Sequence, residues 1–167
     1  MTGGHSTPDR GGERADRARA TVMQGDRAKA YRPIPPDLRR EALEDGLAAF
    51  QRGEFFLAHE LLEPAWMGTS NLAERALYQG LIKLAAGYVH ALRGNPIGVG
   101  RNLRGARELL ETSQRLDPEM AVAARIDLPA LLEGVDDRLA AVAAIADGLS
   151  TGRGPLIDLL PPAPKIR

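Results

Sequence analysis

The hydrophobic positions of this chain recur at the spacing of amphipathic helices over most of its length. In residues 38–53 apolar side chains stand three or four positions apart, and residues 54–67, 72–93 and 96–116 follow the same pattern. A last helix is expected over residues 128–149, where apolar residues alternate at spacings of four and three. No segment alternates at a period of two over the length of a strand. The pattern predicts an all-α fold of about five helices in antiparallel hairpins, arranged as a helical bundle or a short repeat-like array.

The two ends of the chain differ in composition from this helical region. Residues 1–33 alternate arginine with aspartate or glutamate among glycine and alanine, and they carry too little apolar surface to offset the ordering of the chain. We expect them to form a disordered, solvated arm. Residues 34–150 are expected to be a single helical domain. Residues 151–167 are expected to be a proline-broken tail whose apolar side chains lie against the domain or a partner.

The composition narrows the chemistry open to the chain. Its 167 residues include 22 basic and 22 acidic side chains and no cysteine. The missing cysteines exclude disulfides and thiolate-bound metals, favour a reducing cytoplasm, and leave His, Asp and Glu as the metal ligands. A net charge of zero gives no global attraction to nucleic acid, and no apolar run is long enough to span a membrane. We expect a cytoplasmic protein whose partners are neither membranes nor nucleic acids.

Two polar stripes on otherwise apolar helices are the most informative pattern. On a helical wheel of about 100° per residue, His59 and Glu63 fall within an aromatic face, with Trp66 beside them. The next helix carries a stripe of Gln79, Lys83 and His90. Because an unpaired buried charge costs several kcal/mol, the two stripes are expected to pack on each other. The predicted polar cluster or ligand pocket consists of His59, Glu60, Glu63, Trp66, Gln79, Lys83 and His90.

Within this cluster we expect Glu63 to meet Lys83, Gln79 to supply amide hydrogen bonds, and Trp66 to form a wall. Three interpretations stay open. The first is a satisfied polar network that fixes the register of the helices, and the second is a pocket for a small molecule or a peptide. The third is a catalytic or metal site.

For the metal interpretation, the candidate ligands are His59, Glu63 and His90, and a divalent transition metal is the expected ion. The same three residues are the candidates for acid–base catalysis. Two observations count against a metal. Glu63 stands where a His-Glu-x-x-His hydrolase has its second histidine, and Lys83 would bring an ammonium group toward the cation.

The same region resembles a known family. The residues that carry the resemblance are His59, Glu60, Glu63 and Trp66 in one helix, and the motifs Gln79-Gly80-Leu81-Ile82 and Tyr88-x-His90-x-x-x-Gly94-Asn95 in and after the next. Together they make residues 38–135 similar to the domain of unknown function 309 family. The resemblance implies a small all-helical domain, mostly bacterial and archaeal, without an established biochemical activity. Pro64 departs from the family pattern and is expected to kink its helix.

The leading hypothesis from the sequence is a non-enzymatic helical-hairpin module without a cofactor. It would bind an unknown protein or a small ligand, or it would form a homo-oligomer. The alternative is a metal-dependent or acid–base enzyme, similar to a hydrolase. Both hypotheses place the site between the helices expected at residues 54–67 and 72–93.

Overall fold

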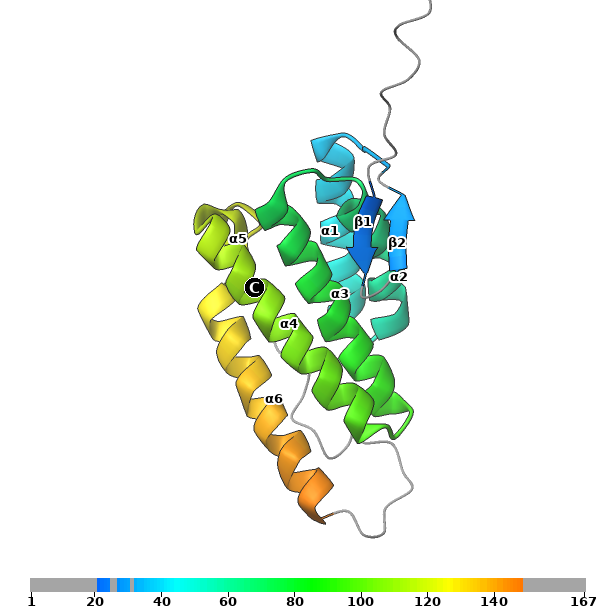
Figure 1. Cartoon of the computed structure of the whole chain (residues 1–167), viewed down its shortest axis with the longest axis vertical. Coiled ribbons are helices and arrows are strands. Elements are labelled where there is room, and N and C mark those ends of the chain that lie inside the picture. The colour runs from blue at the N-terminus through cyan, green and yellow to red at the C-terminus, as the bar shows by residue number, and fades with distance from the viewer. Residues whose placement is uncertain (1–20, 25–26, 31, 149–167) are drawn as a thin grey trace, which may run out of the picture. The chain divides into compact units, whose positions relative to one another are not determined.

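A computed structural model describes residues 21–24, 27–30 and 32–148 of the chain. Residues 32–148 form the helices α1 (Pro36–Gln51), α2 (Phe55–Met67), α3 (Leu72–Leu92), α4 (Pro96–Leu116), α5 (Glu119–Ala123) and α6 (Leu128–Gly148) (Figure 1). The all-α fold that the apolar pattern predicts is confirmed, and each long helix begins and ends close to its expected limits. In the described part of the chain, no helix is long and apolar enough to cross a membrane.

Two strands precede the helices. β1 (Thr21–Gln24) and β2 (Arg27–Ala30) pair antiparallel, with Thr21 opposite Ala30 and Gln24 opposite Arg27. Both strands fall within residues 1–33, the segment expected to be a solvated arm. The strands are too short to show a period of two, but Gly25-Asp26 separates them in the sequence, and such pairs favour two-residue hairpin loops. Residues 1–20 of the predicted arm and the predicted tail at 151–167 lie outside the described residues.

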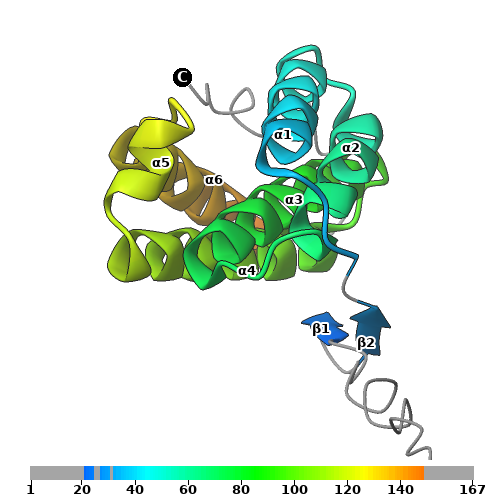
Figure 2. The same ribbon diagram turned by 90° about the horizontal axis from the view of Figure 1, so that it is seen from above.

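The hairpin and the helices belong to separate compact units, and the helical unit begins at Arg32. In the helical unit, neighbouring long helices pack side by side, α1 on α2, α2 on α3, α3 on α4, and α4 on α6 (Figures 1 and 2). The α3–α4 contact is close because glycine lies in it. A β-carbon added at Gly80 would come within 2.9 Å of the Leu110 side chain.

The short helix α5 lies in the segment expected to be a plain connection between the last two long helices. It spans 5 residues, which is too few to give a helical period in the sequence. Arg125 follows it with a φ of 57°, in the left-handed region that a non-glycine residue seldom adopts. Pro64, expected to kink its helix, lies inside α2, which continues to Met67.

The core holds most of the aromatic side chains of the helical unit. The ring of Tyr88 stacks on Phe55 at a centroid distance of 4.8 Å and meets Phe50 edge to face at 5.8 Å. The Tyr88 hydroxyl accepts a hydrogen bond of 3.0 Å from Nε of Arg138 on α6, and burial raises the pKa of this tyrosine. Trp66 is fully buried, with a relative exposure of 0%. Two aromatic residues of α2, Phe55 and Trp66, therefore belong to the core.

Candidate functional site

A shallow pocket of about 180 Å³ lies between α2 and α3. Its lining consists of Phe56, His59, Ala86, Val89, His90 and Arg93. The structure therefore brings His59 and His90 to one pocket, as the two polar stripes predict. The other residues of the predicted cluster do not line it.

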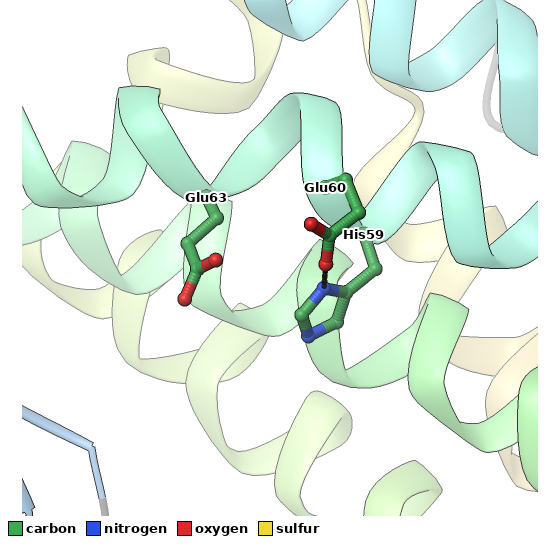
Figure 3. Close-up of side chains that lie close together, drawn as sticks. All are labelled: His59, Glu60 and Glu63. Atoms are coloured by element: carbon green, nitrogen blue, oxygen red, sulfur yellow. Dashed lines mark hydrogen bonds and ion pairs between the residues drawn. The ribbon is translucent and has the colours of Figure 1, made fainter.

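The three polar residues of α2 form a group of their own beside this pocket. Figure 3 shows His59, Glu60 and Glu63 on one side of the helix, with the Glu60 carboxylate turned toward the imidazole. Their ligand atoms all lie within 4.8 Å of one another, the one such group of three or more in the part of the chain that the structure describes. His90 is not a member. His59 and Glu63 of the predicted metal set lie in this group together with Glu60, and the metal set of His59, Glu63 and His90 stays a prediction.

The proton positions on His59 follow from its neighbour. Nδ1 of His59 lies 3.1 Å from Oε1 of Glu60. An ionised carboxylate can only accept hydrogen bonds, so Nδ1 carries the proton that it donates. In the neutral ring, Nε2 then has a free lone pair and acts as an acceptor or a metal ligand.

His90 is held in the opposite tautomer by the start of α4. The side-chain oxygen of Asn95 accepts a 2.9 Å hydrogen bond from the backbone N–H of Gly98 and so caps the helix. This fixes the orientation of the Asn95 amide and leaves its nitrogen 3.1 Å from Nδ1 of His90. An amide nitrogen can only donate, so Nδ1 accepts and the ring proton sits on Nε2.

This arrangement makes His90 a poor metal ligand. Coordination through Nε2 would move the ring proton to Nδ1, where it would face the amide hydrogens of Asn95 instead of an acceptor. Histidine ligands normally donate that proton to a carboxylate or carbonyl. His59, with its Nδ1 proton on Glu60, meets this condition and His90 does not.

The remaining predicted residues lie elsewhere on the helices. Gln79 and Lys83 are half-buried on α3, and the stem of Lys83 runs along α4, since a β-carbon added at Gly105 would lie 2.8 Å from its Cδ atom. Trp66 is a core residue and does not form a wall of the pocket. The contact expected between Glu63 and Lys83 stays a prediction.

A second polar network, which the sequence patterns did not reveal, centres on Glu74 of α3. Arg39 of α1 binds both carboxylate oxygens at 3.0 Å, through Nε and Nη2. The Tyr78 hydroxyl donates to Oε1 at 2.8 Å, and the Thr69 hydroxyl donates to Oε2. The side chains of Arg39 and Glu74 are each 15% exposed, so this ion pair is largely shielded from solvent.

The network sets the ionisation of its members. Burial alone would raise the pKa of Glu74, but the hydrogen bonds from Arg39, Thr69 and Tyr78 together lower it below its ordinary value. The bond to Glu74 raises the pKa of Arg39. Burial, together with the bond to Glu74, raises the pKa of Tyr78 far above the usual range of a phenol. Glu74 is therefore a stable carboxylate at neutral pH, and Tyr78 is a neutral donor.

Part of this network has a local signal in the sequence. Asn71 caps α3 by accepting from the backbone N–H of Glu74, a helix-start spacing of three residues. Tyr78 follows Glu74 by one helical turn. Arg39 could not be placed from the sequence, because it lies 35 residues away and on another helix.

The fold and this geometry define a small all-helical domain with a pocket between two neighbouring helices, lined by one histidine from each. The model of the DUF309 family, described as a domain of unknown function, matches residues 43–109 and confirms the resemblance seen in the sequence. This range contains every residue of the predicted polar cluster. Searches of curated proteins and of solved structures gave no match to the chain.

Proposed function

We propose that this domain is a binding module that takes a small polar ligand in the pocket between α2 and α3. The observation that carries the proposal is the pair of histidines at the pocket, one from each helix, held in opposite tautomers. Each ring has its Nδ1 atom engaged by its own neighbour. Among the described residues neither Nε2 atom has a hydrogen-bond partner, so these atoms can meet a ligand, as an acceptor on neutral His59 and as a donor on His90.

The other lining residues define what such a ligand looks like. Phe56 and Val89 supply apolar contact, and Arg93 supplies a positive charge at the edge of the pocket. The volume of about 180 Å³ is below the roughly 300–1,000 Å³ of pockets that hold drug-sized molecules. The ligand is therefore a small molecule with both a donor and an acceptor, such as a primary amide or a hydroxy acid.

A pocket-filling substitution tests this proposal. Propionamide and lactate, added to the full chain at millimolar concentration, should shift the ring signals of His59 and His90 in nuclear magnetic resonance spectra. Ala86→Leu enlarges a side chain of the pocket lining and should abolish these shifts, because the leucine side chain occupies part of the ligand volume. Ala140→Leu, on an exposed position of α6, is the matched control and should retain them. Absence of ring shifts with both probes, or shifts that survive in Ala86→Leu, would contradict the proposal.

The second candidate function is a metal-dependent or acid–base enzyme at His59, Glu60 and Glu63. It is favoured by the 4.8 Å clustering of their ligand atoms. Glu60 would orient His59 through Nδ1, and Nε2 of His59 with the Glu63 carboxylate would hold a divalent transition metal. Catalytic zinc sites commonly use three protein ligands, and this geometry leaves two for direct coordination, so it ranks below the binding module.

Metal analysis separates the two candidates. Protein purified without a histidine tag should contain no stoichiometric transition metal if the domain is a binding module. A metal that is present in the wild type, lost in His59→Ala and retained in His90→Ala would favour the enzyme instead. His90 is the matched control, because its hydrogen bond to Asn95 opposes metal coordination.

A further inference from the structure

A second pocket, of about 140 Å³, lies between α1, α3 and α5. Leu43, Leu77 and Met120 provide apolar walls, and its polar lining includes Arg40, Glu74 and Tyr78. None of these residues belongs to the α2–α3 pocket. An inference drawn here is therefore independent of the proposed function.

The carboxylate in this pocket has no capacity left for a ligand. Glu74 accepts from Nε and Nη2 of Arg39, from Tyr78 and from Thr69, and a carboxylate offers about four acceptor positions. Arg39 also donates from Nη1 to the carbonyl of Ile34 at 2.6 Å. Arg39 thus neutralises the negative charge of Glu74, which therefore repels a bound anion less than an unpaired carboxylate would.

Arg40 is the polar residue of this pocket that remains available to bind a ligand. Within the described residues, its guanidinium has no ion pair or hydrogen bond. In the neighbouring Arg39, by contrast, all three guanidinium nitrogens are bound to Glu74 or to the carbonyl of Ile34. The Tyr78 hydroxyl already donates its hydrogen bond to Glu74, so toward a ligand it can act only as an acceptor. The pocket therefore presents a cation at its edge and apolar surface within.

The volume of the pocket limits the size of the ligand. A protein cavity of about 150 Å³ is large enough to hold benzene. We propose that this pocket binds a small carboxylic acid with an apolar body of about six carbons, placed between Leu77 and Met120, with its carboxylate on the Arg40 guanidinium. Arginine suits this role because its planar fork can bind both carboxylate oxygens. Met120 suits the wall because its flexible thioether adapts to the shape of the bound group.

Calorimetry and methyl spectra with benzoate, hexanoate and benzamide test the proposal on the full chain. Benzoate and hexanoate should bind and shift the methyl signal of Met120, whereas benzamide, which matches benzoate in shape but has no charge, should bind about tenfold more weakly. Arg40→Gln should weaken benzoate by a similar factor. Arg101→Gln, on an exposed position of α4, is the matched control and should leave it unchanged.

Four results would overturn this proposal. One is equal binding of benzoate and benzamide, and another is unchanged binding in Arg40→Gln. The third is an acid-induced shift at Val89 without one at Met120, because it would place the acid in the α2–α3 pocket. Ala123→Leu should block the site from the α5 side without touching Arg40, and unaltered binding in that variant would also count against the site.

Discussion

Replacement of Glu74 by alanine should lower the free energy of unfolding by about 3 kcal/mol. The carboxylate accepts from Arg39, Tyr78 and Thr69 in a site where the arginine and glutamate side chains are only 15% exposed. Its removal leaves an arginine charge and two hydroxyl donors without their acceptor. Urea unfolding followed by circular dichroism measures the loss. Glu54→Ala removes the partner of an exposed ion pair with Arg52 and should cost less than about 1 kcal/mol.

The pH dependence of stability gives a second measurement of the same network. Because the pKa of Glu74 is lower in the folded chain than in the unfolded chain, its contribution is present above the unfolded value of about 4.3. The contribution is lost as the pH falls through the lower folded pKa. Wild type should therefore lose stability below about pH 4.5 more steeply than Glu74→Gln. Equal acid slopes in the two proteins would show that the network does not hold Glu74 ionised.

Replacement of Trp66 by alanine should lower the free energy of unfolding by about 4 kcal/mol. The indole is 0% exposed, so its removal leaves a large cavity between α2 and the rest of the core. A thermal or urea unfolding curve measures this loss. A variant that unfolds like wild type would place Trp66 at a ligand site and not in the core.

Phe56 is the matched control on the same helix. It is 62% exposed and lines the α2–α3 pocket, so Phe56→Ala should change the free energy of unfolding by no more than about 0.5 kcal/mol. The same variant should weaken the binding of the amide and hydroxy-acid probes. Opposite results for the two aromatic residues would separate the structural face of α2 from its binding face.

The apolar period was sufficient to predict the long helices, because burial of one stripe requires side chains at helical spacing. It failed where an element is too short to show a period. The five residues of α5 and the four-residue strands β1 and β2 are examples. The turn pair Gly25-Asp26 was the available signal for the strands.

Part of the geometry of the candidate site follows from helical spacing, and part depends on contacts that spacing does not determine. Helical geometry brings His59 and His90 to one pocket, since each belongs to the polar stripe of its own helix. It could not predict that Glu60 rather than His90 completes the group with Glu63, because that depends on a side-chain rotamer. The tautomer of His90 depends on Asn95, and the ion pair of Glu74 depends on Arg39. Both are tertiary contacts without a spacing rule.

The hydrogen bond between Asn95 and His90 ties the pocket to a helix that does not line it. A β-carbon added at Gly98, in the first turn of α4, would lie 2.5 Å from Nδ1 of His90 and 2.8 Å from the amide nitrogen of Asn95. Glycine at this position therefore leaves the space in which the His90 ring and the Asn95 amide form their hydrogen bond. Any larger residue at this position would release the imidazole from its amide donor and free its proton to move between the two ring nitrogens. The hydrogen-bonding character of the pocket is thus set in part by a residue that no ligand touches.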